Sequence, residues 1–427
     1  MLIFLVEFSF TSSISQHPVL RSTGGNSSHR LAYGQRLDLT LNLNRSSLRS
    51  SSASDFKSQD QSEEVSTGLF YLQAYDQGKF VENLTLADLA AALEGQPLNI
   101  TGLTLVKGLK VKRAEGQKIA SPILPRVIIL EFKAYDFHQR MGEVVEHLFR
   151  RPYNPSDAIS LITPVNIYSF SSEDLRTRTP QELGQAGLTI LKRDVSAAGR
   201  TENEIIDELT RLVLDLQQGS SAKETLTQYQ QNLESLKSFR KFNPQTITLA
   251  TARFEELRAI KKYIMVYQQE FLPIPNDQMM DRLLANQSVM FQASELFRSI
   301  SSDVSVVVDS IVEDLKQAGM SMNLIYFKAD SRRRPDIKMR ELSTDMFDIY
   351  SKLAYATGGL VEASNTPSAQ LKKILEQTEN YYLLTCQLPA PELTTNWLEQ
   401  PEMREKAEQE IKIYIKNKSY QLSYHRL

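Results

Sequence analysis

The chain has 427 residues, of which 41% are hydrophobic and 23% charged, so it is not wholly disordered and can bury a large core. Lys and Arg number 49 against 51 Asp and Glu, a balance that disfavours nucleic-acid or anionic-membrane binding driven by net charge. The single cysteine, Cys386, excludes internal disulfides and cysteine-based zinc sites. No HExxH, GxSxG, P-loop or GxGxxG pattern occurs, so the familiar enzyme signatures are absent.

The N-terminal residues divide into an apolar segment and a polar one. Residues 1–10 form an apolar run that is too short to span a bilayer, which takes ~20 residues. The run resembles a signal-peptide core but lacks a basic leading region, so residues 1–16 are either a signal segment or a first strand. Residues 17–64 are rich in Ser, Asn and Arg, and we expect a flexible linker there with one strand-like stretch at 37–43.

A small β-rich module is expected at 65–121. Alternating apolar residues predict strands at 69–74, 79–81 and 100–111. Between the second and third of these, residues 86–95 predict a short helix, with Thr85 as N-cap and Gly95 as the stop.

After residue 121 the pattern changes to alternating strands and helices. Residues 126–132 are almost continuously apolar, as expected for a strand buried on both faces of a parallel sheet. Further strands are expected at 158–164, 165–170, 263–271, 322–327, 360–364 and 381–387, and helices at 137–150, 180–191, 247–259, 287–317, 345–356 and 368–376. This alternation over short connections predicts an α/β domain at 122–390 with a doubly wound, mostly parallel sheet.

Two further segments modify this domain. Residues 201–242 predict two long amphipathic helices that span too few heptads for a free coiled coil. We interpret them as a helical insertion docked on the domain; a partner-binding arm is the alternative. Residues 391–427 predict a linker followed by a β-hairpin, because 410–416 and 420–425 alternate around Asn417-Lys418.

Several motifs in this order resemble a known family. The β-module is similar to the one that precedes a von Willebrand factor type A-like (VWA) domain in a bacterial exported "VWFA-related" group, with Leu89 where Phe is usual. Its matching positions are Asp76, Gly78, Val81, Leu84, Thr85, Asp88 and Gly95. The turn Ala356-Thr357-Gly358-Gly359 and the strand Tyr381-Tyr382-Leu383-Leu384 match the end of the same domain. The resemblance covers residues 69–427 and implies a VWA-like fold in an exported protein.

The resemblance also locates a metal site. VWA domains usually bind Mg²⁺ through D-x-S-x-S at the carboxyl end of the first strand, where open α/β sheets bind ligands. Glu131, Lys133 and Tyr135 occupy those positions here, and Gln268-Gln269-Glu270 stands where the family often has Ser-Asp-Gly. Mg²⁺ needs oxygen ligands, whereas a lysine ammonium repels it and can pair with Glu131 instead. We therefore expect that the metal site has been lost and that no metal or cofactor is bound.

Other residues are candidates for weaker hypotheses. Glu131, Lys133, Tyr135, Asp136 and His138 form a polar cluster that is compatible with acid–base catalysis, but no second cluster matches it as a partner. The possible interaction residues are Asp136, His138, Gln269, Glu270, Arg332, Arg333, Arg334 and Trp397. The three arginines are either an anion site or a solvated loop, and Trp397 is either an interaction anchor or a residue that pins its linker.

The sequence thus favours a non-enzymatic protein–protein interaction module at the cell envelope, in the periplasm or outside the cell. Its partner is an unknown protein, and no nucleic acid or transmembrane span is expected. A Mg²⁺-dependent VWA receptor is the main alternative, and an enzyme using residues 131–138 is a weaker one. A cytoplasmic location stays open.

Overall fold

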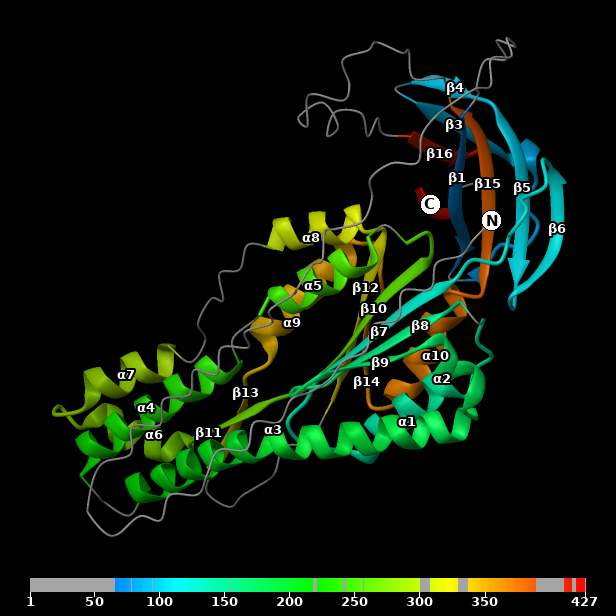
Figure 1. Ribbon diagram of the computed structural model, residues 1–427. Helices are drawn as coiled ribbons and strands as arrows, with labels where there is room; N and C mark the ends of the chain where they lie inside the picture. Colours follow the sequence, from blue (N-terminus) through cyan, green and yellow to red (C-terminus); the bar gives the residue numbers. More distant parts are fainter. Residues whose placement is uncertain are drawn as a thin grey trace, which may run out of the picture. The chain divides into compact units, whose positions relative to one another are not determined.

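The computed structural model describes residues 66–388 and 411–426, apart from 78, 94, 155, 218–220, 241–242, 256, 300–307, 329–336 and 417–419. The expected signal segment and linker at 1–64, the basic run at 332–334 and Trp397 lie outside the described residues. The described residues belong to one compact unit, Ser62–Leu427. It is a mixed α/β structure that contains a β-sandwich, a mixed sheet flanked by helices, and a group of helices around a two-stranded sheet (Figure 1).

The β-sandwich is built from both ends of the described chain. Its strands are β1 (Ser66–Asp76), β2 (Lys79–Phe80), β3 (Leu89–Leu93), β4 (Gln96–Leu98), β5 (Ile100–Lys107), β6 (Lys110–Gly116), β15 (Asn380–Leu388), β16 (Ile411–Ile415) and β17 (Gln421–Arg426). The larger sheet has the order β17-β1-β15-β5-β6 with β2 paired to β1, and the smaller sheet has the order β16-β3-β4. Phe70, Leu103, Leu384 and Ile413 are buried in the core of this sandwich.

Two expectations about the C-terminal strands are wrong. β15 does not join the α/β sheet, because it pairs antiparallel with both β1 and β5 (Figure 1). β16 and β17 do not form a hairpin, because β16 pairs with β3 and β17 pairs with β1 in the other sheet. Tyr382 packs in the sandwich core and Tyr381 in a separate core, so β15 is buried on both faces. An apolar run of this kind looks the same in a parallel sheet and in a central antiparallel strand.

The prediction of a helix at 86–95 is also wrong. Leu86–Asp88 form a single 3-10 turn with Thr85 as N-cap, and β3 begins directly at Leu89. β3 pairs with β16 and β4, which buries Leu89 and Ala91 in the sandwich. Burial and strand pairing therefore outweigh the helix propensity of this alanine-rich segment.

The α/β part has a six-stranded sheet with helices on both faces. Its elements are β7 (Arg126–Lys133), α1 (Gln139–Phe149), β8 (Ala158–Ile162), β9 (Ile167–Phe170), α2 (Ser172–Thr177), α3 (Pro180–Gln217), α5 (Gln245–Phe254), β10 (Ile260–Gln268), α8 (Val308–Gln317), β12 (Met320–Phe327), α9 (Thr344–Ala356), β14 (Val361–Ser364) and α10 (Pro367–Gln377). The strand order is β14-β12-β10-β7-β8-β9, and only β9 runs antiparallel to its neighbour. Ile128 and Leu130 pack with α1, α3 and α10, whereas Val127 and Ile129 pack with α5, α8 and α9.

A third core belongs to a group of elements that we call the helical lobe. It consists of the C-terminal half of α3 with α4 (Ala222–Arg240), α6 (Asp277–Ala285), α7 (Met290–Ser299) and the antiparallel pair β11 (Phe271–Pro275) and β13 (Ile337–Glu341). The expected insertion at 201–242 is therefore only part of a larger unit. The helix expected at 180–191 and the first of the two expected within 201–242 are one helix of 38 residues, α3, which runs from the sheet into the lobe.

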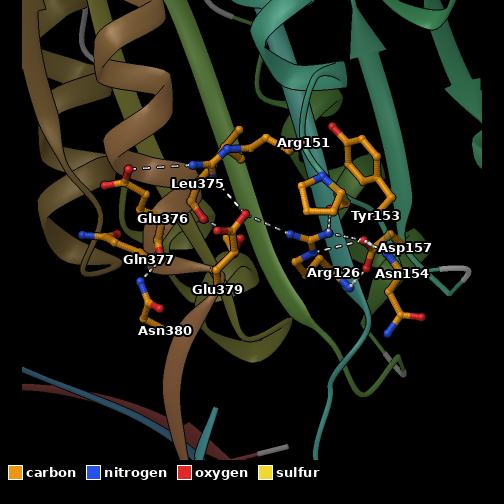
Figure 2. A network of polar contacts seen from close by, with 12 residues as sticks. Arg126, Arg151, Tyr153, Asn154, Asp157, Leu375, Glu376, Gln377, Glu379 and Asn380 are labelled. Carbon is orange, nitrogen blue, oxygen red and sulfur yellow. Dashed lines mark hydrogen bonds and ion pairs between the residues drawn. The ribbon is translucent and has the colours of Figure 1, made fainter. Parts of the chain in front are cut away.

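The chain leaves the sandwich for β7 and returns to it through β15, and a buried network joins these two points (Figure 2). Arg126 is 1% exposed; its Nε donates to Asp157 Oδ2 at 3.0 Å and its Nη1 lies 3.6 Å from Glu379 Oε1. Arg151 Nη1 approaches the same Glu379 oxygen at 3.1 Å. Each charged group in this network has a partner of opposite sign, so the network is a structural junction.

The turn after α9 uses its two glycines for different reasons. Gly358 has a φ of +69°, and no other atom lies within 4 Å of the position that a Cβ would take. A Cβ on Gly359 would lie 1.6 Å from the carbonyl oxygen of Met322 on β12. The first glycine therefore provides a left-handed backbone conformation, and the second allows close approach to β12.

Gly359→Ala is expected to lower the free energy of unfolding by more than about 3 kcal/mol, because the new methyl group collides with backbone that cannot move freely. Gly358→Ala, the matched control, should cost about 1–2 kcal/mol, the cost of a left-handed conformation for a residue with a Cβ. Urea unfolding followed by circular dichroism measures both losses. Equal losses would contradict the close-approach explanation.

Candidate functional site

Two charged side chains at the carboxyl end of β7 form an ion pair. Glu131 is 3% exposed, and its Oε2 accepts a hydrogen bond of 2.5 Å from the Tyr263 hydroxyl on β10. Lys133 Nζ lies 3.8 Å from Glu131 Oε1. Each oxygen of the Glu131 carboxylate therefore has a positively polarised partner from the protein itself.

The loop that follows β7 is held from two sides. The backbone N–H groups of Tyr135 and Asp136 both donate to Gln268 Oε1, each at 3.2 Å. α3 crosses this loop in direct contact, since a Cβ on Gly199 would lie 1.7 Å from the carbonyl oxygen of Tyr135. Only glycine permits this approach, so α3 covers the loop at the third position of the metal motif.

A second buried ion pair lies just beyond the carboxyl end of β10. Arg240 at the end of α4 is 9% exposed, and its Nε donates to Glu270 Oε2. Its Nη2 donates to the carbonyl oxygen of Leu342 at 3.1 Å and lies 3.6 Å from Asp345 Oδ1. These contacts fasten the helical lobe to the β10–β11 connection and to the start of α9.

The pKa values of two carboxyl groups near this edge are raised. Burial, together with the charges of Glu270 and Asp136, raises the pKa of Glu202 on α3 to about 8, although Arg240 works in the opposite direction. Burial also raises the pKa of Glu270, although Arg240 works in the opposite direction. The pKa of the Tyr135 hydroxyl lies above its usual value, again mainly because of burial. Glu202 is therefore mainly protonated at pH 7.

Most of the residues expected at the metal motif lie together. Glu131 and Lys133 contact each other, and Tyr135 follows in the loop that α3 covers. Glu270 lies in the adjoining ion pair, where it contacts Arg240. The carboxyl ends of β7 and β10 therefore meet in one polar cluster, as parallel neighbours do.

The remaining candidates have other roles or lie elsewhere. His138 is exposed and caps α1, because its Nδ1 accepts a hydrogen bond of 3.1 Å from the Arg140 N–H. The N–H of Gln269 donates to the carbonyl oxygen of Phe327 at 2.9 Å. Arg332, Arg333, Arg334 and Trp397 lie outside the described residues.

Sequence reasoning missed the residues that close this edge. They are Gly199, Glu202, Arg240 and Tyr263. A glycine inside an amphipathic helix and an arginine at the end of another were visible as patterns. Their partners lie far along the chain, so only the folded structure identifies what each of them contacts.

The ligand chemistry available at this edge does not suit a hard cation. Mg²⁺ needs several oxygen ligands in near-octahedral geometry. Among the described residues, no group of three or more His, Cys, Asp or Glu side chains is placed to hold a metal ion. At the motif itself, one oxygen of Glu131 faces an ammonium and the other a hydroxyl donor.

No family model matches the chain, and no curated protein matches it. An aerotolerance-related membrane protein from Bacteroides fragilis, crystallised with multiple mutations to serine, aligns at 9% identity over 60% of this chain and 98% of that one, with a TM-score of 0.27. The N-terminal domain of TFIIH p34 aligns at 7% identity over 60% and 98%, with a TM-score of 0.24. The human COPII-coat protein Sec24c aligns at 9% identity over 62% and 39%, with a TM-score of 0.28. Scores this low carry no argument about this chain.

Glu202→Gln is expected to raise the melting temperature by a few degrees at pH 8.5 and to change it little at pH 5. The folded pKa of Glu202 is raised to about 8, so the folded chain binds a proton that the unfolded chain has released. Stability linked to this group is complete below its unfolded pKa of ~4.3 and is lost as the pH rises through the folded value. The glutamine variant cannot ionise and escapes that loss.

Glu204→Gln is the matched control for this measurement, because Glu204 lies on the same helix but is exposed. Its melting temperature should follow that of the wild type across the same pH range. A Glu202→Gln profile parallel to the wild-type profile would contradict the assignment.

Proposed function

We propose that this chain is a non-enzymatic protein–protein interaction module on a VWA-like fold whose metal site has been replaced by internal polar contacts. The strand order supports a doubly wound sheet. In chain order, β7 is the first strand of the sheet and β10 the fourth, and the observed arrangement follows the doubly wound order 3-2-1-4-5-6. The two strands are neighbours, which makes their carboxyl ends the switch point of the sheet.

The observation that carries this proposal is the closure of the switch point by the chain itself. Open α/β sheets bind ligands at this place. Here Gly199 brings α3 onto the Tyr135 carbonyl, and Arg240 of the helical lobe pairs with Glu270. Lys133 supplies the positive charge beside Glu131 that a metal ion would otherwise supply. These contacts support the loss of Mg²⁺-dependent ligand capture.

The same geometry supports a role without catalysis. Glu131 is buried against Tyr263, whereas His138 is exposed and engaged as a helix cap. General acid–base chemistry needs two groups that reach one reacting atom. Glu131 and His138 make no contact of this kind in the structure.

The helical lobe is the proposed partner-binding surface. Phe291 on α7 is 79% exposed, more than any other large apolar side chain among the described residues, and Leu284 on α6 is 39% exposed. Exposed aromatic side chains are typical anchors of protein interfaces.

The proposed location at the cell envelope rests on the family resemblance alone. In the described part of the chain, no helix is long and apolar enough to span a membrane.

The melting temperature is expected to be the same in EDTA, in excess Mg²⁺ and in excess Mn²⁺. A ligand at 100 times its Kd would stabilise the fold by about 2.7 kcal/mol, a shift of a few degrees. Lys133→Ser should not create a response, because Tyr263 and α3 still occupy the site. A saturable rise with either metal in the wild type would favour a Mg²⁺-dependent receptor instead.

Immobilised chain is expected to capture the same protein partner from an extract of its own organism in EDTA and in Mg²⁺. Phe291→Ser should reduce capture at least about tenfold, as loss of an aromatic anchor does, while changing the free energy of unfolding by no more than about 0.5 kcal/mol. Val111→Ser on β6, where the valine is 44% exposed, is the matched control and should capture normally. Capture that needs Mg²⁺, or that both variants retain, would contradict the proposal.

A further inference from the structure

A second polar site lies near the amino-terminal ends of β10 and β12. A pocket of about 750 Å³ is lined there by these strand ends, by the glycine turn after α9, by α10, and by β1 and β17 of the sandwich. Hydrogen bonds hold these elements together, since Gln73 Nε2 donates to the carbonyl oxygens of Gln377 at 2.6 Å and Asn380 at 2.8 Å. The volume is typical of pockets that bind small organic molecules.

Two polar side chains that line this pocket lie side by side and have no partner among the described residues. Lys262 on β10 and Ser321 on β12 are directly paired in the parallel register, so both side chains project from the same face of the sheet. Lys262 is only 6% exposed, and its side chain makes no hydrogen bond or ion pair within the described part of the chain. The hydroxyl oxygen of Ser321 is buried and likewise has no hydrogen-bond partner there. Most buried polar side chains in proteins have a partner, so this pair calls for an explanation.

The charge of the pocket lining has one sign. Its ionisable residues include Lys261, Lys262, Lys316 and Lys373, and no Asp or Glu is among the described residues that line it. Lys261 donates to two backbone carbonyls and Lys373 pairs with Glu362 outside the pocket. Among the described residues, Lys262 is a largely buried lysine without an acidic partner. Burial lowers the pKa of Lys262 to about 8, so it still carries its charge at pH 7.

We propose that this pocket binds a small organic phosphomonoester, with the phosphate group held between Lys262 and Ser321. A phosphate accepts hydrogen bonds from both an ammonium and a hydroxyl, and its charge compensates that of the lysine. Tyr75 and Tyr424 also line the pocket and provide aromatic surface for the organic part. The site is distinct from the proposed protein-interaction surface, because none of the described residues that line the pocket belongs to the helical lobe. It also lies at the opposite end of the sheet strands from the polar cluster of Glu131.

Calorimetric titration of the full chain at pH 7 with phenyl phosphate, inorganic phosphate and phenol tests this site. Phenyl phosphate is expected to bind saturably, inorganic phosphate more weakly, and phenol not at all. Lys262→Met should weaken phenyl phosphate binding at least about tenfold, and Ser321→Ala by a smaller factor. Lys110→Met, at an exposed lysine on β6, is the matched control and should bind like the wild type.

Thermal unfolding without ligand gives a second readout. Lys262→Met should melt at a higher temperature than the wild type, because it removes a buried charge without a partner. Absence of saturable phenyl phosphate binding, or equal binding by Lys262→Met and the wild type, would overturn the proposal. If inorganic phosphate bound as tightly as phenyl phosphate, the proposal that the ligand carries an organic group would be overturned.

Discussion

The guanidinium of Arg126 is almost wholly buried where the chain passes from the β-sandwich into the α/β sheet, and a charge in that position is costly without acidic partners. Asp157 and Glu379 supply them. Asp157 lies just before β8, and Glu379 lies between α10 and β15, the strand that returns to the sandwich. Arg126 thus connects the start of β7, where the chain leaves the sandwich, to the start of β15, where it returns. Glu379 directly precedes β15, whose pairing with β1 and β5 builds the larger sheet of the sandwich, and the contacts of this junction are drawn in Figure 2.

The two edges of the α/β sheet differ in how their charges are compensated. At the carboxyl edge, Glu131 has Lys133 and Tyr263, and Glu270 has Arg240. Arg240 comes from α4 of the helical lobe, which thereby contacts the carboxyl end of β10. At the amino-terminal edge, Lys262 is buried without any such partner among the described residues. A charge that the chain compensates internally points to structure, and one that it leaves uncompensated points to a ligand.

The length of α3 connects these features physically. Its N-terminal half packs against the sheet through Leu183 and Leu191, and its C-terminal half contributes Leu209 and Val213 to the lobe. Between them, Gly199 lies against the loop after β7. One helix thus contacts the sheet, the loop after β7 and the lobe.

Local features that depend on neighbouring residues could be predicted from the sequence. The apolar run of β7, the amphipathic α1 and α9, and the glycine turn at 358–359 follow from periodicity and turn chemistry, and each is present in the structure. The Glu131–Lys133 ion pair could also be predicted from the sequence, because side chains two residues apart on a strand share a face.

Local patterns did not predict that β15 pairs with β1, that β16 and β17 lie in different sheets, or that residues 89–93 form a strand. These outcomes depend on pairing between segments about 300 residues apart, which no local pattern encodes. The partners of Gly199, Arg240 and Lys262 were hidden for the same reason. Burial and the presence of a counter-charge are properties of the folded chain. They distinguish the cluster of Glu131, whose charges have internal partners, from Lys262, which has none among the described residues.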